Sequence, residues 1–244
     1  MSLLLVTGTG TGVGKTVVAA ALAALALAAG RRAGVVKVAQ TGVGPDEGGD
    51  LDEVRRLAAV PAADLRELTR LGPALSPEAA ARLEGRDGPG LADCARQVAA
   101  AAAGRDLAVV EGSGGLLVRF DSSGWTLADL ATELAAPVLV VADAALGTLN
   151  ATALTLQVLR SRRIGCAGVV VGSWPVPPAT PGLAQRSNLQ DLEALAGAPL
   201  AGVLPAGAAR LSPQAFVAAA RAGLCPALGG TFDAADFRRT HGLP

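Results

Sequence analysis

Residues 8–16 read Gly8-Thr9-Gly10-Thr11-Gly12-Val13-Gly14-Lys15-Thr16, and this stretch decides the fold of the 244-residue chain. It follows an apolar run, residues 3–7, that predicts a buried strand, and it opens an Ala- and Leu-rich run, residues 15–29, that predicts a helix. Strand, glycine-rich turn and helix in this order indicate a P-loop, although Gly8 lies one residue earlier than the strict pattern requires. The glycines let successive backbone N–H groups face a phosphate, and the helix N-terminus adds its dipole. The stretch therefore predicts a variant P-loop that binds a nucleotide phosphate.

The alternation of apolar runs and helical patterns continues along the chain. Further buried strands are expected at residues 33–37, 107–110, 137–142, 166–171 and 200–204. Helical patterns cover residues 51–59, 77–84, 91–103, 127–134, 148–160, 189–195 and 213–222. This order and length predict a single α/β domain over residues 1–244 with the P-loop NTPase fold, a mostly parallel sheet with helices on both faces. Ligands bind such folds outside the carboxyl ends of the strands, where loops 42–50 and 173–182 should lie.

The composition argues against nucleic acid and membrane partners. Acidic and basic residues balance at 21 each, Tyr is absent, and no basic stripe carries interleaved aromatic residues. The apolar run 17–29 has thirteen residues, too few to span a bilayer. Cys94, Cys166 and Cys225 lie far apart without metal-type spacing, so we interpret them as reduced structural thiols. We expect a soluble, cytoplasmic protein.

Lysine is rare in this chain, and both lysines follow predicted strands or their turns. Lys15 and Lys37 stand against nineteen arginines. A lysine ammonium is a compact point charge that fits within a ring of backbone N–H groups, whereas the guanidinium fork is bulkier. We expect Lys15 to reach the outer phosphates of a nucleotide and Thr16 to offer its hydroxyl to Mg²⁺. Chance placement stays an alternative for Lys37.

Acidic residues at predicted strand and loop ends are candidate metal ligands. Glu111 follows the predicted strand 107–110 and precedes Gly112-Ser113-Gly114-Gly115, whose glycines let a ligand approach the backbone. Asp143 also ends an apolar strand, and we rank it second, as a turn or cap residue. Asp50 starts a helix near the P-loop, where one loop carboxylate would suit Mg²⁺. The residues alone do not separate it from its acidic neighbours Asp46, Glu47, Asp52 and Glu53.

The only histidine, His241, lies in the tail, where we expect it to be solvated. The chain therefore offers no Ser-His or Cys-His pair for nucleophilic catalysis. Proton transfer must use carboxylates, lysine, water or an amine of the substrate.

Four motifs, in order, resemble the dethiobiotin synthetase family. They are the long P-loop, Lys37 with Thr41-Gly42, Glu111-Gly112-Ser113-Gly114-Gly115, and Leu146-Gly147-Thr148-Leu149-Asn150. The resemblance runs from Leu3 to about Gly207, and the long P-loop is itself a family feature.

The resemblance implies the closure of a cyclic urea from 7,8-diaminopelargonate, CO₂ and ATP with Mg²⁺, giving dethiobiotin, ADP and phosphate in biotin biosynthesis. One substrate amine takes up CO₂ as a carbamate, which attacks the γ-phosphorus to form a carbamic-phosphoric anhydride. The second amine then displaces phosphate. Because the substrate supplies both nucleophiles, a chain without a catalytic histidine suits this reaction, in which placement and charge stabilisation dominate.

The resemblance also implies roles for individual residues. Lys15, Lys37 and Thr11 would act in catalysis, the two lysines by neutralising the γ-phosphate and the carbamate. Thr16, Asp50 and Glu111 would hold Mg²⁺, and the match at Gly49-Asp50 places Asp50 above its acidic neighbours. The diamine would meet Thr11, Lys37 and Thr41, and its carboxylate would bind across a homodimer interface at Gly147, Thr148, Leu149 and Asn150. Further nucleotide contacts are expected at Gly12, Val13, Gly14, Val17, Gly112, Ser113, Gly114, Gly172, Ser173, Pro205, Ala206 and Gly207.

Two positions depart from the family pattern. Many members carry Asn-Asp after the fifth strand to read the adenine edge, where this chain has Gly172-Ser173. The preference for ATP over other nucleoside triphosphates is therefore open. Many relatives also carry a larger polar or acidic residue at Gly12, so this loop is expected to be more flexible before ligand binds.

A second hypothesis is a P-loop ATPase switch of the partition or septum-placement type. Such proteins usually have a lysine early in the loop, near Gly10, and often a basic DNA patch or an amphipathic membrane helix, none of which this sequence shows. A third hypothesis, a cobyrinate amidase or a nickel chaperone, would need a glutaminase domain or a metal-binding tract, and neither is present in the sequence.

Overall fold

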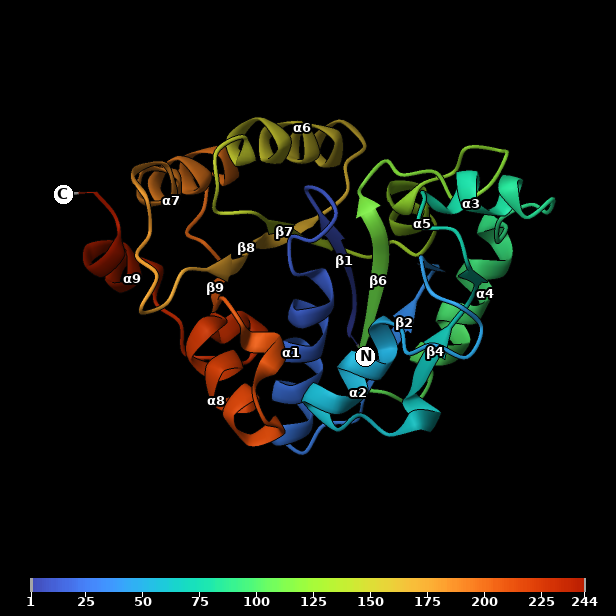
Figure 1. The fold of residues 1–244 in the computed structure, drawn as a ribbon, viewed down its shortest axis with the longest axis horizontal. Coiled ribbons are helices and arrows are strands. Elements are labelled where there is room, and N and C mark those ends of the chain that lie inside the picture. Colours follow the sequence, from blue (N-terminus) through green and yellow to red (C-terminus); the bar gives the residue numbers. More distant parts are fainter. Residues whose placement is uncertain (1, 244) are drawn as a thin grey trace.

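The computed structural model describes residues 2–243, which form an α/β fold around one long parallel sheet (Figure 1). In this part of the chain the sheet has seven strands in the order β4-β2-β6-β1-β7-β8-β9, and all its strand pairs are parallel. The strands are β1 (Ser2–Gly8), β2 (Ala33–Lys37), β4 (Leu65–Glu67), β6 (Leu107–Gly115), β7 (Val138–Ala142), β8 (Cys166–Trp174) and β9 (Gly202–Pro205). A separate short pair joins β3 (Gln40–Thr41) to β5 (Arg70–Leu71).

Helices cover both faces of the sheet. They are α1 (Lys15–Ala28), α2 (Asp50–Ala58), α3 (Pro77–Leu83), α4 (Leu91–Ala102), α5 (Leu127–Glu133), α6 (Thr148–Ser161), α7 (Leu183–Ala196), α8 (Pro213–Gly223) and α9 (Ala234–His241). Apolar side chains of α1, α2 and α8 form one core cluster, and those of α4, α5, α6 and α7 form the other. In β1, Leu4 and Val6 belong to the first cluster and Leu5 to the second, as the two-residue period of a strand requires. The predicted layered α/β architecture is confirmed.

The central strands and the first helix form where the apolar patterns predict them. The helix α1 is buried along most of its length, from Val18 to Ala26, because it packs on the middle of the sheet between α2 and α8. Its alanines allow a close approach to these neighbours. The helix begins directly after Gly14, whose φ of 98° lies in the left-handed region that glycine adopts readily. The P-loop is therefore seated at the centre of the sheet.

Several boundaries differ from the predictions. The strand β6 continues through Glu111 to Gly115, and β8 continues through Gly172 and Ser173 to Trp174, because backbone pairing with β1 and β9 carries on past the apolar runs. The helix α7 begins at Leu183, six residues earlier than expected. The short strands β3, β4 and β5 were not predicted.

The C-terminal helix α9 was not predicted either, and the expectation for His241 was wrong. Its imidazole is half-buried and stacks on Phe237, with ring centroids 4.2 Å apart and planes 15° apart. The side chain of Asp233 accepts a hydrogen bond from the backbone N–H of Asp236, which caps the start of α9. The tail thus folds back onto the body of the protein.

Among residues 2–243, none of the helices combines the length and the apolar character needed to cross a membrane.

Candidate functional site

The P-loop is held in place by contacts between backbones. A side chain at Gly172 of β8 would overlap the carbonyl oxygen of Val13, and a Cβ on Gly14 would lie 2.8 Å from the carbonyl oxygen of Gly172. Two glycines therefore let β8 support the loop directly. Gly12 and Gly14 both have positive φ, at 77° and 98°. The loop therefore makes the turn that the sequence predicted, and α1 begins directly after it, at Lys15.

Lys15 lies within the curve of the loop. Its Nζ donates to the carbonyl oxygen of Gly10 at 2.8 Å, and its side chain is buried. Burial lowers the pKa of Lys15, although the carboxylate of Glu111 opposes this shift. A cation withdrawn from water at the N-terminus of α1 is well placed to meet the outer phosphates of a nucleotide.

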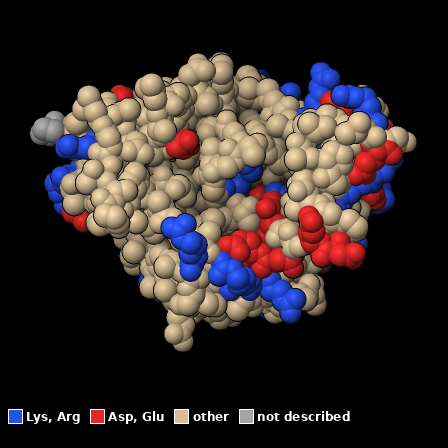
Figure 2. Space-filling model, in the orientation of Figure 1, with Lys and Arg blue, Asp and Glu red and all other residues tan. Residues whose placement is uncertain are grey.

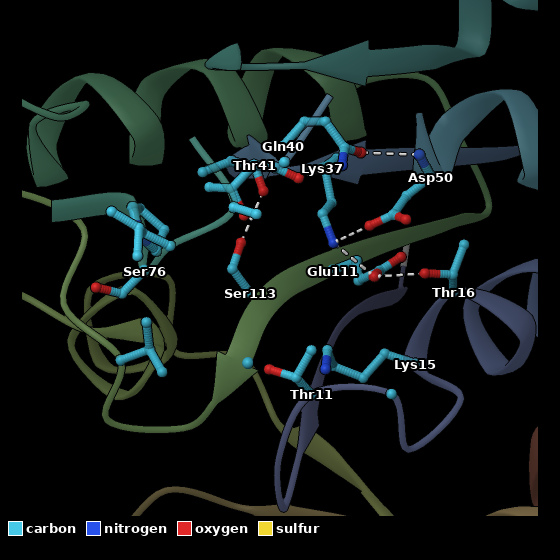
Figure 3. Close-up of a pocket in the computed structure, with 18 of the residues that line it drawn as sticks. Thr11, Lys15, Thr16, Lys37, Gln40, Thr41, Asp50, Ser76, Glu111 and Ser113 are labelled. Carbon is cyan, nitrogen blue, oxygen red and sulfur yellow. Dashed lines mark hydrogen bonds and ion pairs between the residues drawn. The ribbon is translucent and has the colours of Figure 1, made fainter. Parts of the chain in front are cut away.

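Opposite the P-loop, Lys37 lies between two carboxylates (Figure 3). Its Nζ is 2.7 Å from Glu111 Oε1 and 2.5 Å from Asp50 Oδ2. Lys37 and Glu111 are register partners on the adjacent strands β2 and β6, so their side chains leave the sheet on the same face. Asp50 is the first residue of α2. The structure therefore brings together three residues that are far apart in the sequence.

This cluster is buried. The side chains of Glu111 and Lys37 are 1% and 4% exposed, and that of Asp50 is 35% exposed. Burial lowers the pKa of Lys37, but Glu111 and Asp50 more than offset this effect, so the pKa is raised overall. Lys37 is consequently protonated at neutral pH, and its two ion pairs fix its ammonium group in this cluster.

Thr16, Glu111 and Asp50 offer the oxygen ligands that Mg²⁺ prefers. The Thr16 hydroxyl donates to Glu111 Oε1 at 2.8 Å, while Glu111 Oε2 is buried without a partner in the described structure. An unpartnered buried carboxylate oxygen fits a cation. Residues 2–243 contain no group of three or more His, Cys, Asp or Glu side chains suited to a metal. A cation with two carboxylates and a hydroxyl would thus need phosphate oxygens and water as well, as Mg²⁺ usually does.

A cavity of about 740 Å³ opens between the P-loop and this cluster. Predicted site residues that line it are Thr11, Gly12, Gly14, Lys15, Thr16, Val17, Lys37, Thr41, Asp50, Glu111, Ser113 and Gly114. Gly112 contributes its carbonyl oxygen, which accepts a hydrogen bond from Lys37 at 3.3 Å. We call this space the reaction cavity, after the role proposed for it below.

Sequence reasoning missed two polar residues of the reaction cavity, Gln40 and Ser76. Gln40 lies in the short strand β3, and its Oε1 accepts the backbone N–H of Asp50 at 2.8 Å. It thereby caps α2 and fixes the residue that pairs with Lys37. A glutamine before Thr41 gave no recognisable signal, because the contact depends on how the loop folds. The other unpredicted lining residues are Ala39, Gly42, Ala74, Leu75, Pro77 and Val118.

A second, smaller cavity of about 260 Å³ lies on the other side of the P-loop. Its lining consists of Gly12, Val13, Asp143, Ser173, Pro175, Gln185 and Ala206. Gly12 lines both cavities, so the P-loop forms the partition between them. Ser173, Ala206 and Val13 were predicted nucleotide contacts, and Pro205 and Gly207 flank Ala206. We call this space the nucleoside cavity, after the role proposed for it below.

Asp143, a sequence-level competitor for the metal, lies away from Glu111. Its Oδ1 accepts the backbone N–H of Ala145 at 3.0 Å, and it lines the nucleoside cavity. This is the turn role that the sequence favoured for it.

Gly147, Thr148, Leu149 and Asn150 line neither cavity. They form the start of α6, where Gly147 has a φ of 96° and the hydroxyl of Thr148 is buried without a partner in the described structure. The preceding Leu146 is 89% exposed. These residues therefore do not join the rest of the predicted site within one copy of the chain.

The surface in Figure 2 carries acidic and basic side chains side by side over α2, where Asp50, Asp52, Glu53, Arg55 and Arg56 lie. On this face the charges are mixed and form no basic stripe, in keeping with the balanced composition.

Two kinds of comparison relate the chain to known proteins. A family model described as an AAA domain matches residues 2–213. The ATP-dependent dethiobiotin synthetase BioD of Parafrankia sp. is 57% identical over 243 residues, covering 100% of both chains. The synthetase of the same name from Streptomyces coelicolor is 54% identical and covers 99% of this chain and 100% of its own.

Solved structures with a similar fold are more distant. A MinC:MinD cell division protein complex of Aquifex aeolicus matches with a TM-score of 0.54 and 14% identity, covering 91% of this chain and 95% of that chain. A ParA family ATPase of Chlorobium tepidum matches with a TM-score of 0.54 and 13% identity, covering 93% and 95%. At such low identity these structures show a shared fold alone, whereas the relatives above match in sequence over the full length. The chain has an AAA domain and belongs to the family of ATP-dependent dethiobiotin synthetases.

Proposed function

We propose that this enzyme closes the cyclic urea of dethiobiotin from 7,8-diaminopelargonate and CO₂ in the reaction cavity, at the expense of ATP. Dethiobiotin synthetase activity is the activity of its family. The observation that carries the detailed proposal is the position of Lys37, a buried cation between Glu111 and Asp50 that faces the P-loop across one cavity. A carbamate and a γ-phosphate could meet there between two lysines.

The proposed reaction needs placement more than proton transfer. Lys15 would neutralise the γ-phosphate, and Lys37 would neutralise the carbamate oxygen that attacks the γ-phosphorus. Both ammonium groups are withdrawn from water, so their electrostatic stabilisation of the transferring phosphoryl group is strong. Thr11 and Thr41 also line the reaction cavity and would hydrogen-bond the diamine end. The second amine of the diamine would then displace phosphate from the carbamic-phosphoric anhydride.

Thr16, Asp50 and Glu111 would hold Mg²⁺, which would supply charge neutralisation for the phosphate oxygens. The orphaned Oε2 of Glu111 and the free face of Asp50 toward the reaction cavity support this assignment. Gln40 would keep Asp50 in place through its cap on α2.

The nucleoside would lie on the other side of the P-loop. Gly12, Val13, Ser173 and Ala206 line the nucleoside cavity, and Pro205 and Gly207 flank it. The remaining predicted contacts, Gly14, Val17, Gly112, Ser113, Gly114 and Gly172, would surround the phosphates. Gly172 and Ser173 present no side-chain amide, so the polar side chains left in this lining to contact the base would be those of Gln185, Asp143 and Ser173, beside backbone groups and shape.

We also propose that the enzyme acts as a homodimer, with Gly147, Thr148, Leu149 and Asn150 binding the diamine's carboxylate in the partner's site. Their position at the start of α6, outside both cavities of their own chain, supports this arrangement, as does the exposure of Leu146 and Leu154, at 89% and 60%. Residues 1–244 would form one synthetase domain acting in the cytoplasm, and the packing of both core clusters on a single sheet supports this organisation.

Incubation of the protein with diaminopelargonate, bicarbonate, Mg²⁺ and either ATP or CTP tests the proposal. Diamine-dependent phosphate release with a product of dethiobiotin mass is the expected result, and reactions without diamine are the control. The ratio of the phosphate-release rates with ATP and with CTP reports how Gly172 and Ser173 affect the choice of base. Phosphate release that is indifferent to the diamine would contradict the proposal and favour a switch ATPase.

A further inference from the structure

The C-terminal helix α9 lies beside α7 (Figure 1), and its Phe237 contacts Trp174, the last residue of β8. We propose that α9 is a positioning element of the nucleoside cavity, acting through Trp174 and Arg186 and with Phe237 and His241 as its positioning residues. The inference rests on the proposed function, because it assigns the base and ribose to that cavity.

Trp174 connects α9 to one wall of the nucleoside cavity. Its neighbours Ser173 and Pro175 both line the cavity, while its own ring is buried on the opposite side of the strand. The ring of Phe237 meets it edge-on at a centroid distance of 5.4 Å, and the ring of His241 meets it at 6.1 Å and 90°. Since Phe237 and His241 also stack on each other, α9 presents a rigid aromatic surface that fixes the indole.

The backbone of Trp174 extends this effect to another part of the lining. Its carbonyl oxygen accepts the N–H of Ala206 at 2.7 Å. Ala206 follows β9 and lines the cavity. A displacement of the indole would therefore move Ser173, Pro175 and Ala206 together.

The helix α9 also contacts α7, which supplies Gln185 to the lining of the cavity. The adjacent Arg186 donates from Nε and Nη2 to the carbonyl oxygen of Gly242, at 3.1 and 2.8 Å. Arg238 of α9 forms an ion pair with Glu193, two turns further along α7. Contacts from α9 and from Gly242 directly after it thus reach the neighbours of lining residues in both β8 and α7, although α9 contributes no lining residue itself.

The experiment compares the affinity for ATP with the affinity for inorganic tripolyphosphate, both measured by calorimetry with Mg²⁺. Tripolyphosphate engages the P-loop but has no base or ribose. Phe237→Ala and His241→Ala should weaken ATP binding by about 3- to 10-fold, the scale of a lost aromatic pair, and leave tripolyphosphate binding and the KM for the diamine within about 2-fold. His241→Phe keeps an aromatic ring against Trp174 and should restore ATP binding.

Arg239→Ala is the matched control, because this residue is exposed on the same helix and, among residues 2–243, forms an ion pair with Asp236 alone. It should behave like the wild type. Equal loss of ATP and tripolyphosphate affinity in the Phe237 and His241 variants would overturn the inference, since it would mean a general loss of structure. Unchanged ATP affinity with a lowered Tm would also overturn it, leaving α9 a role in stability alone. Failure of the wild-type protein to bind ATP at all would instead overturn the proposed function.

Discussion

Replacing Lys37 by methionine separates the electrostatic role of the buried cluster from its volume. Methionine fills nearly the same space, so the main change is the loss of the positive charge beside Glu111 and Asp50. Glu111, 1% exposed, would keep a buried negative charge without its partner. Asp50 is 35% exposed and can be solvated, so it contributes little to the loss.

The expected loss of stability in the Lys37→Met variant follows from the burial of Glu111. Removing one partner of a buried ion pair costs about 3–5 kcal/mol. A chain of this size loses about 2–4 °C in Tm per kcal/mol, which gives a decrease of roughly 6–20 °C for the ligand-free protein. The second substitution Glu111→Gln, made on top of Lys37→Met, removes the stranded charge and should recover at least about half of that loss.

Thermal unfolding followed by circular dichroism measures the stability, and diamine-dependent phosphate release measures the activity. We expect the single variant to bind nucleotide within about 10-fold of the wild type through the P-loop, but to release no diamine-dependent phosphate. A Tm equal to that of the wild type would refute the argument from burial. A double variant that is no more stable than the single variant would refute the charge as its cause, and retained turnover would remove Lys37 from the mechanism.

Three further predictions concern other parts of the structure. Gly172→Ala should weaken nucleotide binding by about 10-fold or more, because the new methyl group would overlap the carbonyl oxygen of Val13. Gly10→Ala is the control: a Cβ at Gly10 meets nothing within 4 Å, so this variant should bind nucleotide nearly normally. Equal nucleotide affinities of the Gly172→Ala and Gly10→Ala variants in a binding titration would contradict this expectation. Thr16→Val should raise the Mg²⁺ concentration for half-maximal activity by about 10-fold or more, and an unchanged requirement would exclude the hydroxyl as a ligand. Burial raises the pKa of Cys94 to about 12, so this thiol should resist alkylation at pH 8 until the protein is denatured, and intact mass spectrometry would show any labelling of the native protein.

The sequence was informative wherever a local pattern determines the structure. The run 3–7, the glycines of the P-loop and the Ala/Leu run after Lys15 specify strand, turn and helix within a few residues of one another. Lys37 and Glu111 are charged residues at the ends of apolar strands. Because parallel strands end at the same edge of a sheet, this placement predicted a ligand site there. The fold and the meeting of Lys37 with Glu111 could both be predicted from these features.

Features that depend on distant partners could not be predicted. The strand β6 extends to Gly115 because Gly8 of β1 pairs with it, and a glycine-rich sequence does not show this pairing. Gln40 caps α2 only because a loop brings residues 40 and 50 together. The aromatic contacts of Trp174 with α9 join residues more than sixty positions apart. In each case the tertiary contact, not a local propensity, decides the outcome.

The P-loop lies between the two cavities, and this separation determines how substitutions around them should combine. The strand that carries Lys37 and the strand that precedes Ala206 are separated by five strand spacings, about 24 Å across the sheet. Substitutions that far apart, with no shared partners, usually have additive effects. On the proposed assignment the base binds at the β8 and β9 end and the carbamate at the β2 end. Substitutions that change base preference should then leave carbamate binding unaltered, and a variant library can treat the two ends independently.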